Sequence, residues 1–112
     1  MEDKTQAVFD FVQERCLWQF FSRNWDRERN ITSIMKNVAD LFSGKEVPKE
    51  TNLDKCYFAD AKILLEQLSE RYEWFAGLTG QEVAEICDKV KDKLIDLAVT
   101  NSLNAERTLE YY

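Results

Sequence analysis

Apolar residues recur at intervals of three and four along most of the chain, the spacing that places them on one face of an α-helix. This pattern predicts four amphipathic helices: from about Lys4 to Phe20 or Phe21, from Ser22 or Asn24 to Phe42, from about residue 52 to 72, and from Gly80 to about Ala98. No segment alternates apolar and polar residues as a half-buried strand would. We therefore expect an all-α fold, a small bundle of about four helices in one domain spanning residues 1–112, with a short C-terminal tail.

Local residues predict where these helices begin and end. Gly44 suits the position after a helix, and Pro48 follows it. Thr51 or Asn52 can cap the third helix, and Thr79-Gly80-Gln81-Glu82 has the form of a capping box. Trp74 and Phe75 fall in the short connection before the fourth helix, and the helical pattern weakens after Thr100. Whether the first two helices are separate or form one kinked rod is open, with the break expected at Ser22–Asn24.

The stretch from Cys16 to Glu28 holds two of the three tryptophans, two phenylalanines and two arginines. On a helical wheel, Cys16 and Phe20 fall with Phe9 and Val12 of the preceding turns, whereas the remaining apolar residues fall on roughly the opposite side: Phe11, Leu17, Trp18, Phe21 and Trp25. A helix that feeds one core needs one apolar stripe, so a second surface must cover the second stripe. That surface belongs either to the rest of this domain or to another protein, and both interpretations stay open on the residues alone.

Composition and charge narrow the classes of partner. Apolar residues make up 45% of the 112 residues and charged residues 32%, which is typical of a globular domain. The formal net charge of −6 argues against nucleic acid or an anionic membrane as the partner, because both require a basic face. No apolar run is long enough to span a membrane and no secretory leader opens the sequence, so we expect a cytoplasmic protein.

The residues that usually carry chemistry are scarce. The chain has no histidine, which removes the commonest general base and the commonest metal ligand. Cys16, Cys56 and Cys87 are far apart in the sequence, and each lies at or beside a predicted core stripe, so we expect buried, reduced and unreactive thiols. The many carboxylates lie on the polar faces of the helices. We expect this chain to carry no catalytic residue and no metal ligand.

The stretch from Cys16 to Glu28 also carries a family resemblance. Its sequence, Cys-Leu-Trp-Gln-Phe-Phe-Ser-Arg-Asn-Trp-Asp-Arg-Glu, resembles the signature of the delta subunit of the alternative nitrogenases, the vanadium–iron and iron–iron enzymes. Cys56-Tyr57-Phe58-Ala59-Asp60-Ala61 and three shorter runs, Lys91-Asp92-Lys93, Val99-Thr100 and Ser102-Leu103-Asn104, are also similar to that family. The resemblance covers essentially the whole chain, although the loop at 44–52 and the N-terminus do not match it.

The resemblance implies a role in a larger complex. A delta subunit of this family is a small helical protein bound to the α subunit of component 1 in an α2β2δ2 hexamer with the β subunit, and the iron protein is the reductase. The iron–iron (or iron–vanadium) cofactor and the P-clusters belong to α and β, and this chain would bind none of them. Phe21 and Ala59-Asp60-Ala61 look more like the vanadium relatives, whereas Arg27-Glu28-Arg29, Cys56-Tyr57, Lys91-Asp92 and Ser102-Leu103-Asn104 favour the iron-only relatives. On balance we expect the iron-only enzyme.

The leading hypothesis is an accessory subunit that docks on the α subunit through an aromatic–arginine anchor: Trp18, Phe21, Arg23, Trp25 and Arg27. Trp and Arg are enriched among the residues that dominate binding energy at protein interfaces. Tyr111 and Tyr112 are expected to form a weaker second contact. One alternative is a chaperone or cofactor-insertion factor that meets the apo-enzyme only transiently. Another is an enzyme with a cryptic carboxylate or thiol site.

Overall fold

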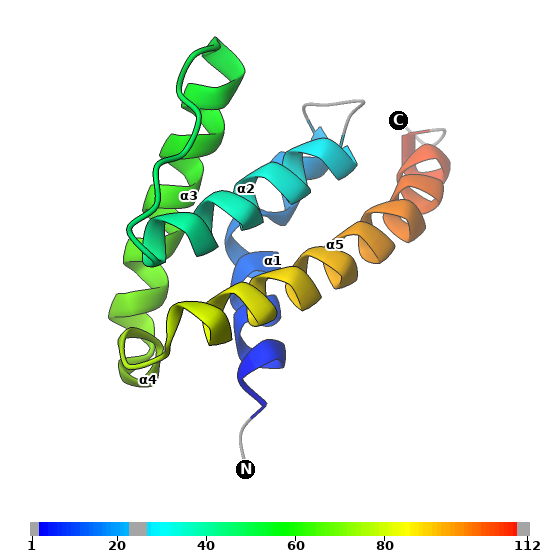
Figure 1. Cartoon of the computed structure of the whole chain (residues 1–112). Helices are drawn as coiled ribbons and strands as arrows, with labels where there is room; N and C mark the ends of the chain where they lie inside the picture. The colour runs from blue at the N-terminus through cyan, green and yellow to red at the C-terminus, as the bar shows by residue number, and fades with distance from the viewer. Residues whose placement is uncertain (1–2, 23–26, 110–112) are drawn as a thin grey trace.

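In a computed structural model of the chain, the described backbone forms five α-helices (Figure 1). The structure describes the backbone of residues 3–22 and 27–109, and the side chains of residues 3–14 and 28–97. The helices are α1 (Lys4–Ser22), α2 (Arg27–Phe42), α3 (Asn52–Arg71), the single turn α4 (Glu73–Ala76) and α5 (Gly80–Leu109). Over the described backbone there is no strand, and the predicted all-α fold with four long helices is confirmed.

Helix α2 holds the bundle together because it packs against both α3 and α5. In Figure 1, α3 stands at one side, α2 and α5 run across the molecule in opposite directions, and α1 crosses behind α2. The main contacts of α1 are with α5. The start of α2 therefore points toward the same end of the molecule as the C-terminal part of α5 (Figure 1).

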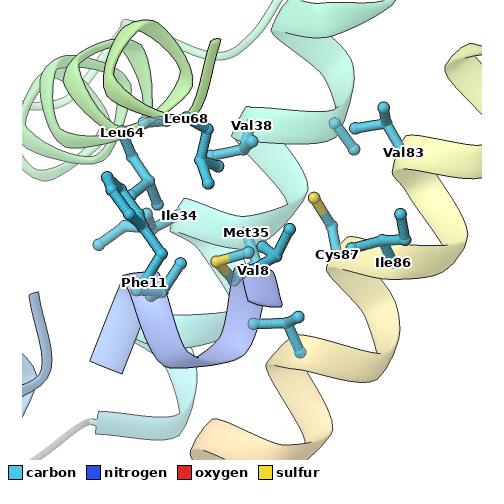
Figure 2. Packing of buried hydrophobic residues seen from close by; sticks show 14 of the residues in the cluster. Val8, Phe11, Ile34, Met35, Val38, Leu64, Leu68, Val83, Ile86 and Cys87 are labelled. Atoms are coloured by element: carbon cyan, nitrogen blue, oxygen red, sulfur yellow. The ribbon is translucent and has the colours of Figure 1, made fainter. Parts of the chain in front are cut away.

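Every helix contributes to a single buried cluster. Figure 2 shows Met35 of α2 beside Val8 of α1, with Cys87 on the adjacent α5 and Phe11 directed toward Leu64 of α3. The α4 turn adds Phe75, which is fully buried and meets Phe42 edge to face with ring centroids 5.5 Å apart. The buried residues of α2, α3 and α5 follow the helical spacing expected of an amphipathic segment: Ile31, Ile34, Met35, Val38 and Ala39; Tyr57, Ala61, Leu64 and Leu68; Val83, Ile86, Cys87, Val90 and Leu94.

The predicted end of α2 and the predicted start of α3 are confirmed by their hydrogen bonds. Gly44 adopts a φ of 75°, and its N–H donates to the carbonyl of Leu41 at 3.1 Å while Lys45 N–H donates to that of Asp40 at 2.8 Å. These two bonds form a Schellman motif at the end of α2. The Thr51 hydroxyl accepts from the backbone N–H of Asp54 at 3.0 Å, and the Asp54 carboxylate accepts from the backbone of Thr51 at 3.2 Å.

The same arrangement closes the start of α5. The Thr79 hydroxyl accepts from the N–H of Glu82 at 3.1 Å, and the Glu82 carboxylate accepts from the N–H of Thr79 at 3.0 Å. This reciprocal bonding lowers the pKa of Glu82, because the ionised carboxylate is the better acceptor. The capping box predicted at residues 79–82 is confirmed.

Three expectations about the helices are corrected. The fourth long helix does not end near Ala98 but runs on to Leu109, because no glycine or proline follows Gly80 to stop it. The connection that contains Trp74 and Phe75 forms the short helix α4. Phe11, placed on the second stripe of the first helix, lies in the main core at 4% exposure beside Val8 and Val12. The open question of one rod or two falls on residues 23–26, which lie outside the described backbone; α1 is described as far as Ser22 and α2 from Arg27.

Candidate partner-binding surface

The predicted anchor lies around the junction of α1 and α2. Trp18 and Phe21 belong to the last two turns of α1, and Arg27 is the first residue of α2. Their side chains, together with the whole of Arg23 and Trp25, lie outside the described residues. Tyr111 and Tyr112 follow the end of α5 and also lie outside them. The anchor therefore stays a prediction, and the described residues beside it show how the start of α2 is held.

A buried hydrogen bond fixes the first turn of α2 to α3. The hydroxyl of Tyr57 donates to the side-chain carbonyl oxygen of Asn30. Both residues are enclosed, with Asn30 8% and Tyr57 5% exposed. A buried polar group needs a partner to offset its loss of water, so this bond specifies how the two helices meet. Asn30 lies only three residues after Arg27, the last residue of the anchor. The bond therefore also holds the backbone at the start of α2, where Arg27 lies.

A groove runs along the seam between α2 and α5, and we call it the α2–α5 groove. It encloses about 230 Å³. Its floor is apolar and includes Met35 and Cys87, which are almost completely buried. Its two walls carry polar and small side chains at intervals of one helical turn, namely Thr32, Lys36 and Asp40 on α2, and Ala84, Asp88 and Lys91 on α5.

The two walls differ in how their charges are paired. On α5, Lys91 Nζ lies 2.9 Å from the Asp88 carboxylate and 3.4 Å from that of Asp92, and these acids raise the pKa of Lys91. On α2, no hydrogen bond or ion pair joins the side chain of Lys36 or Asp40 to another described residue. The α2 wall thus presents a cation and an anion, one turn apart, with no hydrogen bond or ion pair to the described residues.

The two described thiols differ in their exposure to solvent, which the sequence did not predict. Cys87 faces the core, and its burial raises the pKa of the thiol to about 12, so it stays protonated and unreactive near neutral pH. Cys56 is exposed, which corrects the expectation that it is buried. It precedes the buried Tyr57 by one residue, and a rotation of about 100° per residue moves it off the buried face. Cys16 lies outside the residues with described side chains.

Two further surface features are present on the described part of the chain. Leu53 and Ile63, both on α3, are its only exposed large hydrophobic side chains, at 37% and 53%. At the corner between α3 and α4, Tyr72 and Trp74 stack with centroids 4.9 Å apart, and Arg71 and Lys4 lie over the two rings.

Neither a cluster of metal-ligand side chains nor a membrane-spanning helix occurs among the described residues. They contain no group of three or more His, Cys, Asp or Glu side chains placed to hold a metal ion. Within the same residues, no helix combines the length and apolar character needed to cross a membrane.

Comparison with known proteins gives one family. The vanadium/alternative nitrogenase delta subunit family matches residues 2–112. Three similar proteins are each named nitrogenase iron-iron protein delta chain. The protein of Azomonas macrocytogenes is 39% identical over 112 residues, covering 100% of both chains. That of Clostridium pasteurianum is 36% identical, covering 96% of this chain and 97% of the relative, and that of Rhodobacter capsulatus is 33% identical, covering 100% and 97%.

Proposed function

This chain belongs to the vanadium/alternative nitrogenase delta subunit family, and on that premise we propose that it is the accessory, non-catalytic subunit of an iron–iron nitrogenase. The resemblance drawn from the stretch between Cys16 and Glu28 is confirmed by the family match. The single observation that carries the proposal is the match over residues 2–112, since it spans the aromatic–arginine stretch and all five helices.

The iron-only assignment has two supports. The relatives in Azomonas macrocytogenes, Clostridium pasteurianum and Rhodobacter capsulatus all carry the name of the iron–iron protein. Four short runs of this sequence favour the same enzyme, against Phe21 and Ala59-Asp60-Ala61, which favour the vanadium enzyme. As the family resemblance implies, we assign the metal cofactors of the complex to its α and β subunits; the lack of histidine and the wide spacing of the three cysteines in this chain agree with that assignment.

The proposed direct partner is the α subunit of component 1, in a cytoplasmic α2β2δ2 complex that the iron protein reduces. The proposed contact is the anchor, with Tyr111 and Tyr112 as a second point of attachment. Its support is chemical: tryptophan and arginine combine a large apolar area with directed hydrogen bonds, and Asp26 and Glu28 beside them can orient the guanidinium groups. In this role the chain supports the ATP-dependent reduction of dinitrogen without contributing a reacting group.

Co-purification tests this proposal directly. The tagged chain is recovered from cells that fix nitrogen without molybdenum but with vanadium supplied, and the metals in the recovered complex are measured. We expect component 1 α and β subunits, iron and no vanadium. Vanadium in the complex would assign the chain to the other enzyme. Recovery of the tagged chain alone would overturn the proposal, and recovery only with apo-enzyme, without a stable hexamer on size-exclusion chromatography, would favour the transient insertion factor.

The anchor has its own variant. Trp25→Ala combined with Arg27→Ala should remove at least about 2 kcal/mol of binding free energy, roughly a thirtyfold loss of affinity, if these residues dominate the interface. The matched control is Ile63→Ala combined with Arg71→Ala, which removes one large apolar and one arginine side chain from exposed positions on α3. Equal co-purification of both double variants would show that the anchor has been assigned to the wrong residues.

A further inference from the structure

We propose that the α2–α5 groove receives a helix of the partner subunit, so that the contact begun at the anchor continues along α2. The inference rests on the proposed function, because it requires that the chain docks on another nitrogenase subunit. It adds a second binding surface, made of residues that were not among the predicted contact residues, and it specifies the chemistry of the segment that fills this surface.

The groove is continuous with the start of α2. A second, more open depression lies over the first turns of this helix and is lined by Glu28, Arg29, Thr32 and Ser33. Thr32 lines the α2–α5 groove as well. The hollowed surface therefore begins directly after Arg27, the last residue of the anchor, and continues to Asp40. At a rise of 1.5 Å per residue this is a distance of about 18 Å, or three to four helical turns.

The shape of the groove suits a helix. Its border residues stand one turn apart on both α2 and α5, and the small side chains of Ala39 and Ala84 leave room between them. Side chains that recur every turn on an added helix form a ridge that fits such a groove. The buried Met35 and Cys87 beneath provide an apolar floor, so the inserted side chains should be small and apolar.

The charged side chains of the α2 wall specify which charged residues the partner helix should carry beside its apolar residues. Asp88 is already engaged with Lys91, whereas the side chains of Lys36 and Asp40 have no partner among the described residues. Lys36 precedes Asp40 by four residues, one turn of the helix. The complementary segment carries a carboxylate for Lys36 and a cationic side chain for Asp40, about one turn apart, beside its small apolar residues.

Area argues for a partner subunit rather than a second copy of this chain. The groove and the adjoining depression together, about 18 Å long and one helix width of about 10 Å across, offer roughly 200 Å². A stable interface buries about 800 Å² on each partner, so the groove alone cannot sustain a dimer. As an extension of the anchor it becomes one part of a larger contact, which is the arrangement that its continuity with the start of α2 favours.

Filling the groove tests the inference. Ala84 is exposed on the α5 wall, so Ala84→Trp should block the groove without disturbing the core. The matched control is Ala59→Trp, which adds the same side chain at an exposed alanine of α3. Binding of each full-length variant to purified component 1 that lacks this chain is measured by isothermal titration, and circular dichroism establishes that each is folded. We expect Ala84→Trp to weaken binding at least tenfold and Ala59→Trp to change it less than twofold.

A charge reversal provides a second test of the groove, one that does not depend on the size of the introduced side chain. Lys36→Glu should weaken binding more at low than at high ionic strength, because it opposes the proposed carboxylate. The control is Lys62→Glu, which makes the same change at an exposed position of α3. Equal binding by each variant and its control would overturn the inference.

The outcomes separate this inference from the proposed function. If the wild-type chain does not bind component 1, both fail. If it binds, and binding is lost with Trp25→Ala and Arg27→Ala but not with Ala84→Trp or Lys36→Glu, only the groove is wrong. If sedimentation shows a dimer of the chain that Ala84→Trp dissociates, the groove is a self-interface and the inference is overturned.

Discussion

The hydrogen bond between Tyr57 and Asn30 allows a quantitative test of how α2 is positioned. Tyr57→Phe removes only the hydroxyl and keeps the ring, so no cavity opens in the core. The side-chain carbonyl oxygen of Asn30, at a residue that is 8% exposed, then loses the donor that it has in the folded protein. Leaving a buried acceptor without a partner costs about 1–3 kcal/mol, and we expect a loss near 2 kcal/mol in the free energy of unfolding.

Urea unfolding followed by circular dichroism measures this loss. For a chain of this size, about 2 kcal/mol corresponds to a fall of roughly 8 °C in the melting temperature. The matched control is Tyr72→Phe, since Tyr72 is half-buried and no hydrogen bond from its hydroxyl is found among the described residues. That variant should stay within about 0.5 kcal/mol of the wild type.

A double-mutant cycle identifies the bond itself. Once Asn30 is replaced by alanine, Tyr57→Phe should cost much less, with a coupling of about 1–2 kcal/mol between the two positions. The reasoning would be refuted if Tyr57→Phe destabilised the protein no more than Tyr72→Phe does, or if the two changes at Asn30 and Tyr57 were additive. Either result would mean that α2 is held at its first turn by apolar packing alone.

Three further predictions concern local features. Gly44→Ala should lower the free energy of unfolding by about 1 kcal/mol, because Gly44 has a φ of 75°, whereas Gly77→Ala, at a φ of −85°, should not; urea midpoints compare them. The pKa of Glu82 is lowered in the folded protein, so its contribution to stability is present above the ordinary value of 4.5 and is lost as the pH falls through the lower folded-state pKa. The difference in urea midpoint between the wild type and Glu82→Gln should therefore shrink from pH 7 to pH 3. A difference that stays constant would contradict this prediction. With a thiol reagent at pH 8, the Cys56→Ser variant should show one fast-reacting thiol fewer than the wild type, and the Cys87→Ser variant should show the same number as the wild type. The reason is that Cys56 is exposed, while burial raises the pKa of Cys87 to about 12.

The features that the sequence predicted correctly are those decided by neighbouring residues. Thr79 and Glu82 are three positions apart, so their mutual bonding depends on little beyond the local backbone. The buried positions of α2, α3 and α5 likewise follow from helical spacing alone. The exposure of Cys56 was missed because Cys56 was counted with the core stripe that it borders, although its rotation of about 100° from the buried Tyr57 takes it off that face.

The candidate site likewise has one part that the sequence could predict and one part that it could not. The aromatic–arginine composition of the anchor is visible in the sequence, and it led to the correct family. The α2–α5 groove was not visible, because Lys36 and Asp88 become opposite walls only when residues far apart in the chain pack together. The available signal was the pair of small residues, Ala39 and Ala84, but small residues also occur where two helices simply pack closely.

Helix α2 makes folding and binding interdependent in this protein. One face of α2 supplies Ile34, Met35 and Val38 to the core, and the adjacent face supplies Lys36 and Asp40 to the groove. A substitution at Met35 would therefore disturb both stability and the groove floor, and a loss of binding could not be assigned to either. Ala84 and Lys36 are exposed, so their variants separate the two effects. A partner seated in the groove touches α2 and α5 together, and binding only this folded arrangement would stabilise their packing by mass action.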